Sequence, residues 1–194
     1  VRELIWREAD EAVWVLAVRM DLGDGTDPYC QLLSAALDLE LHGQRMRVLA
    51  LLSFIADATA IRRAQEILNV PSATPDQRAY AQEILDLATP QEIKAPVLAL
   101  VDDLSPVQQL QRLQAFFPQR AAGDAERLRE LAETADGRLS AWTLACTLGV
   151  LAAANPSIGE TTMLSILERV IILKSAGIFA AVPDNLLAAV AAAT

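Results

Sequence analysis

Three short strings in the middle of the chain constrain its fold more than any other feature. They are Thr74-Pro75-Asp76-Gln77, Thr89-Pro90-Gln91-Glu92 and Ser105-Pro106-Val107-Gln108. Each string has a hydroxyl residue, then proline, then Gln or Glu three positions after the hydroxyl. This is the pattern of a capping box with proline at the first helical position. The spacing of the strings leaves room for helices of about three turns joined by minimal loops. The middle of the chain is therefore predicted to be an array of short consecutive helices.

The composition extends this prediction to the whole chain. Its length of 194 residues suits one domain, or one domain with an appendage. Hydrophobic residues make up 53%, but many are alanine and only 5% are aromatic. Ala, Leu, Glu, Gln and Arg dominate, and these residues favour helices. No stretch alternates between apolar and polar residues with a period of two, so we expect an all-α protein.

Apolar residues recur at helical spacing along most of the sequence, and they predict about nine or ten helices. Short loops between them favour antiparallel pairs that stack into an α-solenoid with a shallow concave surface. A compact helical bundle is the competing architecture. The most apolar segment, 139–154, is the predicted centre of the domain. The expected helices cover 2–20, 28–56 as one helix or two abutting ones, 58–69, the three segments behind the capping strings, 125–135, 139–154, 160–176, and a last helix after Val182-Pro183-Asp184.

Charge and hydropathy exclude several classes of partner. The net charge is −9 and the sequence pI is about 4.6. Nucleic acid and anionic membrane surfaces both reward a basic face, so neither is an expected partner. The longest uncharged stretch, Leu139 to Ile158, contains Asn155-Pro156 and falls short of the ~20 continuous apolar residues of a membrane span. We therefore expect no direct membrane insertion by this part of the chain.

The sequence shows no metal site. Cys30 and Cys146 lie far apart without metal-type spacing and are expected to be two reduced thiols on helix faces. His42 is the only histidine and is expected to be a surface or structural residue. Residues 21–27 superficially resemble the start of a calcium loop. Counted from Asp21, however, Gly23 and Leu32 stand at positions three and twelve, where oxygen ligands are needed. This segment is instead predicted to be a turn that ends with Asp27 capping the next helix.

No set of side chains predicts catalysis. The carboxylates of Asp102-Asp103 are adjacent on a helix and point in different directions, so a role at the helix end is expected. Arg62-Arg63 and the pair Arg45 and Arg47 could contact anions, but a solvated face is the favoured interpretation. Trp14 is expected to be an exposed contact. We therefore predict no catalytic, cofactor-binding or metal-binding residues, no cofactor, and no enzyme activity.

Two parts of the chain carry a family resemblance. The run from Leu39 to Asp103 contains four helical segments that are similar to the HEAT-type segment of certain bacterial fusion proteins: Arg45–Leu52, Ala60–Ala64, Arg78–Asp86 and Val97–Asp103. Those fusions place an ATP/ADP-translocase-like or major-facilitator-like membrane domain upstream and a cyclic-nucleotide-binding domain downstream. The resemblance implies a HEAT-like α-solenoid.

The second resemblance lies between Met163 and Leu187. Six residues match the helix, turn and short helix that lead into a cyclic-nucleotide-binding domain: Leu173, Lys174, Ser175, Phe179, Pro183 and Asp184. The Gly-Glu phosphate cassette, the arginine and the β-roll of that family do not occur before Thr194. The resemblance therefore assigns no cyclic-nucleotide-binding residue to this chain.

Together these observations predict a non-catalytic scaffold. Residues 1–159 would form a HEAT-like domain, and residues 160–194 would form the helical lead-in to a truncated cyclic-nucleotide-binding domain. The chain begins with Val1, and we expect it to be a fragment of a longer bacterial protein at the cytoplasmic face of the inner membrane. Its partners would be the adjoining domains, with a possible protein partner on the concave face. The alternative is a stand-alone protein–protein interaction scaffold with a concave partner-binding surface.

Overall fold

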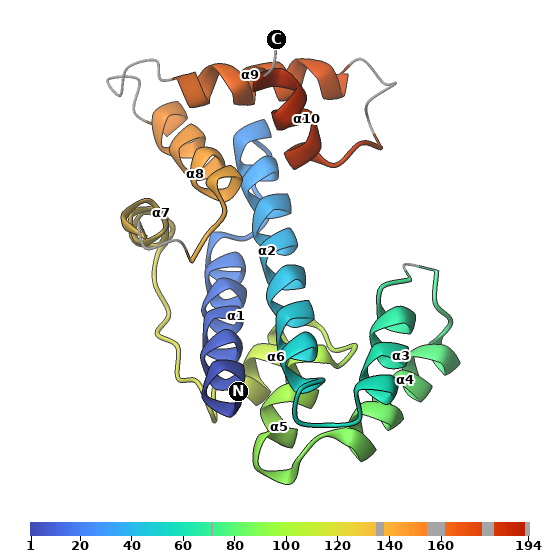
Figure 1. Cartoon of the computed structure of the whole chain (residues 1–194). Coiled ribbons are helices and arrows are strands. Elements are labelled where there is room, and N and C mark those ends of the chain that lie inside the picture. Colours follow the sequence, from blue (N-terminus) through green and yellow to red (C-terminus); the bar gives the residue numbers. More distant parts are fainter. Residues whose placement is uncertain (71, 135–137, 155–161, 176–180, 193–194) are drawn as a thin grey trace. The chain divides into compact units, whose positions relative to one another are not determined.

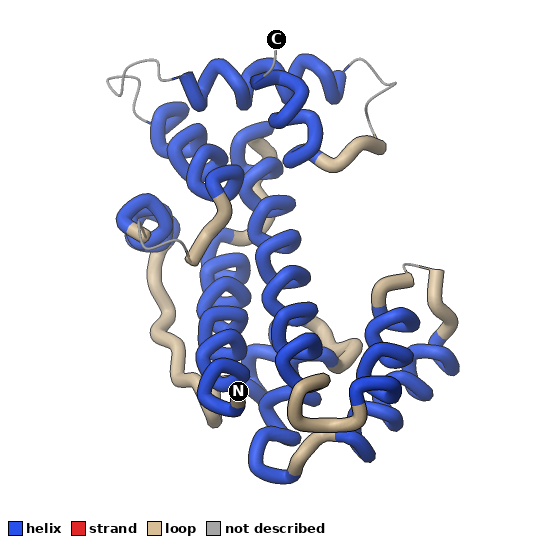
Figure 2. Tube along the Cα trace, in the orientation of Figure 1, coloured by secondary structure: helices blue, strands red, loops and turns tan. Residues whose placement is uncertain are grey.

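The computed structural model describes residues 1–70, 72–134, 138–154, 162–175 and 181–192. Over these residues the chain forms ten helices and no strand (Figures 1 and 2), so the prediction of an all-α fold is confirmed. The helices are α1 (Arg2–Leu22), α2 (Pro28–Leu52), α3 (Ala58–Leu68), α4 (Pro75–Ala88), α5 (Gln91–Val101), α6 (Pro106–Leu113), α7 (Asp124–Glu133), α8 (Ala141–Ala154), α9 (Thr162–Ser175) and α10 (Asp184–Ala192).

The chain divides into two compact units. Unit 1 comprises Val1–Met20 and Leu41–Ala121, and unit 2 comprises Asp21–Glu40 and Ala122–Thr194. The predicted boundary between residues 159 and 160 falls outside the described residues and stays a prediction. The predicted helix ends at Asp136-Gly137, Asn155-Pro156 and Gly177 also lie outside the described ranges and stay predictions.

In unit 1, helices that follow one another along the chain pack together: α3 with α4, α4 with α5, and α5 with α6. Contacts between distant parts of the sequence add to this pattern. The Trp6 ring lies 5.3 Å from that of Phe117 and 6.4 Å from that of Phe116, measured between ring centroids. Arg47 Nε donates to Glu8 Oε2 at 2.8 Å. These contacts tie the first helix to α2 and to the residues just after α6.

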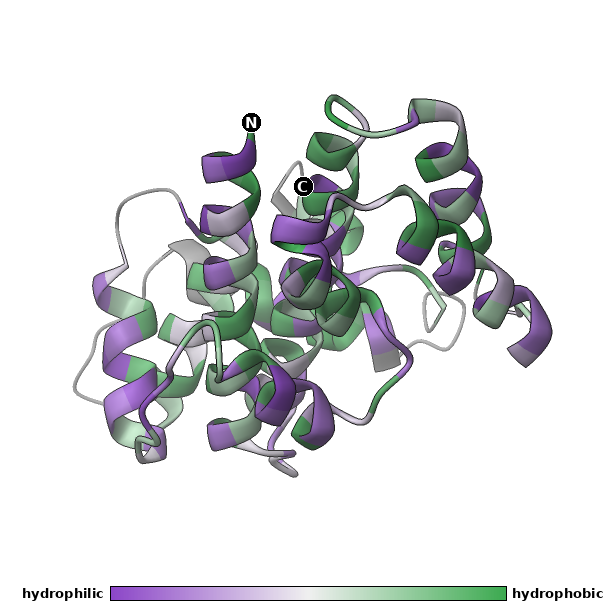
Figure 3. Ribbon diagram, turned by 90° about the horizontal axis from the view of Figure 1, so that it is seen from below, coloured by the Kyte–Doolittle hydropathy of each residue, from purple (hydrophilic) through white to green (hydrophobic). Residues whose placement is uncertain are grey.

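Helix α1 is buried more completely than its sequence predicted. Trp6, Ala9, Val13, Leu16 and Met20 recur at seven-residue intervals in the sequence, which predicts one apolar stripe, and Ala9, Val13 and Leu16 of this stripe are buried. Every residue of 15–18 is also buried, as is Ala12. Hydrophilic residues stand in the first turns of α1, beside the N-terminus in Figure 3, and Arg19 and Asp21 stand in its last turn. Residues 12, 13 and 15–18 of α1 therefore belong to the core of unit 1. The prediction that the segment 139–154 is the centre of the domain stays a prediction.

Two of the three predicted capping boxes are confirmed. Thr74 Oγ1 accepts from the Gln77 N–H at 3.3 Å, and the Gln77 side chain accepts from the Thr74 N–H at 2.8 Å. Ser105 and Gln108 form the same reciprocal pair at the start of α6. Helix α6 itself ends at Leu113, earlier than the predicted end at Phe116-Phe117.

The box predicted at Thr89 is wrong. The residue preceding α5 is Pro90, which makes no side-chain cap. The N–H of Thr89 donates to the carbonyl of Leu85 at 2.9 Å, and its Oγ1 donates to the same oxygen at 2.6 Å. Only residues 89 and 90 separate α4 from α5. Thr89 closes the preceding helix, and its hydroxyl is directed toward the Leu85 carbonyl instead of the first N–H groups of α5.

Helix α4 also corrects the predicted core. The apolar residues of this segment, which its sequence predicts to face the core, are Tyr80, Ala81, Ile84, Leu85 and Leu87. Ala81 and Leu85 are buried, but Tyr80 and Leu87 are exposed. Residues four apart lie on one helix face, and the pair Ala81 and Leu85 defines the inner face that the helix uses.

In unit 2 the packing again follows the chain: α7 with α8, α8 with α9, and α9 with α10. Helix α8 approaches its neighbours closely at Gly149. A Cβ there would lie 2.7 Å from Leu167 Cδ1 and 3.0 Å from Tyr29 Cδ1, so only glycine fits without movement. The predicted cap of α2 is confirmed, because the Tyr29 N–H donates to Asp27 Oδ1 at 2.8 Å.

Candidate functional site

A small polar cavity in unit 1 is the first candidate for a functional site. Its volume is about 110 Å³. Such a volume holds a few water molecules, whereas drug-sized ligands occupy pockets of roughly 300 Å³ or more. It is lined by residues of α2 and α4, by the last residues of α3 and α5, and by the two residues after α5: His42, Arg45, Met46, Leu68, Arg78, Gln82, Val101, Asp102 and Asp103.

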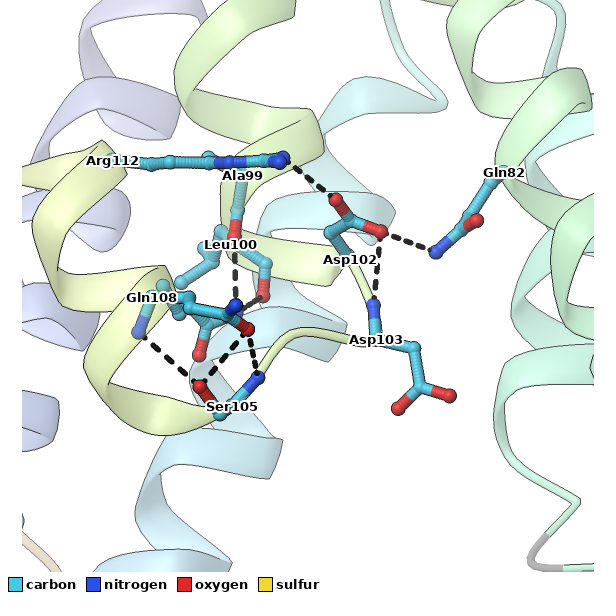
Figure 4. A network of polar contacts seen from close by, with 9 residues as sticks. Gln82, Ala99, Leu100, Asp102, Asp103, Ser105, Gln108 and Arg112 are labelled. Carbon is cyan, nitrogen blue, oxygen red and sulfur yellow. Dashed lines mark hydrogen bonds and ion pairs between the residues drawn. The ribbon is translucent and has the colours of Figure 1, made fainter.

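Asp102 is the centre of the polar network beside this cavity (Figure 4). Its Oδ1 accepts from Gln82 Nε2 at 2.6 Å and from the Asp103 N–H at 3.0 Å. Its Oδ2 accepts from Arg112 Nη1 at 2.9 Å. One carboxylate therefore joins α4, the end of α5 and α6.

The position of Asp102 explains why it needs these donors. It is the C-terminal cap residue of α5, and its N–H donates to the Leu98 carbonyl. A carboxylate at a helix C-terminus faces the negative end of the helix dipole. The guanidinium of Arg112 and the amide of Gln82 offset that repulsion. The carboxylate of Asp103 points away from this network in Figure 4, as adjacent positions predict.

Gln109 makes a second connection beneath the network. It is buried, and its Nε2 donates to the carbonyl oxygens of Ala99 at 3.0 Å and Leu100 at 2.7 Å. Its Oε1 accepts from Arg45 Nη2 at 2.5 Å. A single amide thus satisfies two carbonyls in the last turn of α5, which have no partner within the helix, and joins α6 to α2.

The arrangement is suited to holding helices together. No serine, cysteine or lysine lines the cavity to act as a nucleophile. Cationic and anionic side chains share the same small wall, so the cavity offers neither a uniform anion site nor a uniform cation site. We interpret the Asp102 network as a structural junction of three helices.

The other candidate residues in the sequence do not gather at one site. His42 is exposed at the rim of the cavity. The guanidinium of Arg63 lies over the Tyr80 ring, 5.2 Å from its centroid. Trp14, expected to be an exposed contact, is only partly exposed. No signal in the sequence linked Gln82 or Arg112 to Asp102, or Gln109 to the end of α5, because these partners come from different helices.

Unit 2 contains a buried ionic cluster that the sequence did not indicate. Arg127 is 2% exposed. Its Nε donates to Asp21 Oδ2 at 2.9 Å, and its Nη1 donates to Glu130 Oε2 at 2.6 Å. The N–H of Ala122 donates to the same Asp21 oxygen at 3.3 Å. Asp21 and Glu130 together satisfy a cation that water cannot reach.

A second carboxylate in unit 2 caps a helix from another part of the chain. Glu40 Oε1 accepts from the Ser140 N–H and from Thr143 Oγ1, both at 2.7 Å. Helix α8 begins directly after Ser140. A negative charge is favourable at a helix N-terminus, so Glu40 anchors α8 to α2.

A larger cavity in unit 2, of about 260 Å³, lies beside α9 and α10. It is lined by Pro28, Gln31, Leu32, Ile171, Lys174 and Asp184. Lys174 Nζ and Asp184 Oδ1 lie 2.7 Å apart. Both residues belong to the string that resembles the lead-in of a cyclic-nucleotide-binding domain.

The two cysteines carry no disulfide. Burial raises the pKa of the Cys146 thiol to about 12, and the charge of Asp184 adds to the shift. Burial also raises the pKa of Cys30, with contributions from Asp27 and Asp124. A thiolate is the reactive form, so neither thiol is activated. Within the described ranges no group of three or more His, Cys, Asp or Glu side chains is placed to hold a metal ion.

Comparison with protein-family models, curated proteins and solved structures finds no match to this chain. The resemblance to HEAT-type fusion proteins therefore rests on the residues of the sequence. No helix in the described part of the chain has both the length and the hydropathy that crossing a membrane requires.

Proposed function

We propose that this chain is a non-catalytic, HEAT-like scaffold that links a transporter-like membrane module to a cyclic-nucleotide sensor. The observation that carries the proposal is the ion pair between Lys174 and Asp184, at 2.7 Å. These residues stand at the end of α9 and the start of α10. They are also the charged members of the string that resembles the sensor's lead-in.

A scaffold of this kind must pass movement from one module to the next. Helices α9 and α10 pack together, and Arg169 Nη1 of α9 donates to the carbonyl of Ala191 near the end of α10 at 2.8 Å. With Lys174 and Asp184 at the other end, α10 is held to α9 at two points. A sensor that displaced α10 would pull on α9, and through α9 on the helices packed against it.

The packing of successive helices within each unit supports the solenoid part of the proposal. In a solenoid each helix contacts mainly its neighbours in the chain, and the stack flexes as a spring. Antiparallel helix pairs joined by short loops would produce this pattern. In the full-length protein we place the scaffold at the cytoplasmic face of the inner membrane.

The decisive experiment is to sequence the coding DNA on both sides of the segment that encodes this chain. We expect several membrane spans upstream, and downstream a β-roll with a Gly-Glu phosphate cassette. An upstream region without membrane spans would remove the transporter link.

Calorimetry with cyclic AMP and cyclic GMP tests whether the cyclic-nucleotide sensor is a separate module and not part of this chain. We expect no binding by the isolated chain, because the resemblance assigns no nucleotide-binding residue to it. Specific binding at micromolar concentrations would place the sensor within this chain and contradict the proposal.

A stand-alone scaffold that binds a protein partner is the second candidate. Its specific support is the exposure of large apolar side chains on unit 1, above all Phe54 and Leu87. Exposed apolar residues that gather on one face mark interaction sites. This candidate needs neither a transporter nor a sensor.

A further inference from the structure

The outward side of α4 carries apolar residues at a helical interval. Leu87 is 79% exposed and Phe54, in the turn before α3, is 77% exposed, the two highest values for large hydrophobic residues in the described ranges. Tyr80 is also exposed. Tyr80 and Leu87 are seven positions apart, two helical turns, so they project from the same side of α4.

The contact between α3 and α4 brings Phe54 into the same region. Only residues 69–74 connect these two packed helices, and so short a connection turns α4 back along α3. The guanidinium of Arg63 over the Tyr80 ring sets the register between the two helices. Because the two helices run in opposite directions, a step of seven residues forward from Tyr80 on α4 corresponds to a step of seven residues back from Arg63 on α3. Leu87 therefore lies level with the segment 54–57 that leads into α3.

Carboxylates surround the apolar residues. Glu83 is exposed and follows Tyr80 by three positions and precedes Leu87 by four, so it lies on the same side of the helix. Asp76 and Asp86 are exposed near the two ends of α4, the latter paired with Lys94 at 3.3 Å. The face defined by Phe54, Tyr80, Glu83 and Leu87 is here called the α4 face. It combines exposed apolar side chains with the carboxylate of Glu83, and the guanidinium of Arg63 covers the Tyr80 ring at one end of it.

We propose that the α4 face docks a basic amphipathic helix of a partner protein. Leucine-like side chains of the partner would cover Phe54 and Leu87, and a lysine or arginine would pair with Glu83. A second copy of this chain is a poor occupant because each copy carries a net charge of −9. Anionic lipid and nucleic acid are repelled for the same reason. This inference rests on the partner-binding candidate and needs neither adjoining module.

The test uses the whole 194-residue chain and a fluorescein-labelled model peptide of leucine and lysine that is patterned as an amphipathic helix. Fluorescence anisotropy measures the binding of the peptide to the chain. A peptide with glutamate in place of lysine and a peptide with scrambled leucines are the comparison probes. We expect the patterned leucine–lysine peptide to bind, and the other two to bind about tenfold more weakly or less. Salt should weaken the binding by screening Glu83.

Two variants and two matched controls locate the binding. Leu87→Ser and Glu83→Lys should each weaken it about tenfold, since one removes an apolar anchor and the other creates repulsion. Leu186→Ser and Glu133→Lys make the same changes at exposed positions in unit 2 and should leave affinity within about twofold. All four positions are exposed, so the variants are expected to fold, and circular dichroism checks this.

Three outcomes would overturn the proposal: no binding of the leucine–lysine peptide, equal binding of the glutamate peptide, or equal losses in the control variants. None of them bears on the transporter and the sensor, whose presence the flanking DNA decides.

Discussion

Two ionic clusters in the described part of the chain have opposite designs. In unit 2 a buried cation, Arg127, lies between the carboxylates of Asp21 and Glu130. In unit 1 a partly exposed carboxylate, Asp102, accepts from Gln82 and Arg112. Water can replace a lost partner at Asp102 but cannot reach Arg127. The comparison shows that the same residue types are obligatory partners in one place and replaceable partners in the other.

The largest effect is expected for Arg127→Ala. The change leaves a cavity and two carboxylates without their shared cation, and should lower the free energy of unfolding by about 3 kcal/mol or more. Urea denaturation measures the loss. Arg129→Ala, at an exposed position of the same helix, is the matched control and should cost less than about 0.5 kcal/mol. Equal losses in the two variants would show that the buried cluster contributes nothing specific.

A smaller effect is expected for Asp102→Ala. Gln82 and Arg112 lose their acceptor but can rehydrate, so the free energy of unfolding should fall by about 1–2 kcal/mol. Asp103→Ala is the control, because the neighbouring carboxylate is exposed and lies outside the network. It should cost less than about 0.5 kcal/mol. If the two variants lost the same stability, the helix junction at Asp102 would be refuted.

The buried thiol of Cys146 should make the stability of the chain depend on pH in the alkaline range. The pKa of Cys146 is about 12 in the folded chain, against about 8.5 for an unperturbed thiol. Above the unfolded pKa the unfolded state releases this proton while the folded state keeps it, so stability falls as pH rises. At about pH 9.5 the loss reaches about 1 kcal/mol relative to neutral pH.

The variant Cys146→Ala measures how much the buried thiol contributes to the loss of stability at alkaline pH. Its stability should decline less steeply than that of the wild-type chain over the alkaline range, in parallel urea titrations. Identical slopes would mean that Cys146 ionises in the folded state as easily as in the unfolded state.

The smallest effect is expected for Arg112→Ala. The Arg112 side chain is largely exposed, and exposed ion pairs contribute about 0.5 kcal/mol. Adding salt to about 1 M, where the Debye length is about 3 Å, should remove most of this difference while leaving the loss in Arg127→Ala nearly unchanged. A salt-independent effect at Arg112 would make the two clusters alike.

Local patterns in the sequence predicted the helices well. Hydroxyl, proline and glutamine at fixed spacing identified the starts of α4 and α6, because a capping box involves only residues within one turn. The failure at Thr89 has an equally local cause. When only two residues separate α4 from α5, the same threonine can end one helix or begin the next, and the hydroxyl bonds to Leu85.

Tertiary features were harder to predict. Periodicity identifies the apolar positions on α4, but it does not separate the exposed Tyr80 and Leu87 from the residues that face the neighbouring helices. The residues around Asp102 and Arg127 come from distant parts of the chain, and each one alone resembles an ordinary charged surface residue. Burial, which distinguishes Arg127 from Arg129, is set by the packing of whole helices and is invisible in a local pattern.

The close approach at Gly149 gives a means of recognising relatives of this chain. A side chain larger than hydrogen at position 149 would collide with Leu167 and Tyr29. We therefore expect the three positions to change together in homologous sequences: a small residue at 149 beside large ones at 29 and 167, or a larger residue at 149 with a smaller partner. Covariation among these three positions in an alignment of relatives would show that the relatives share this contact between three helices.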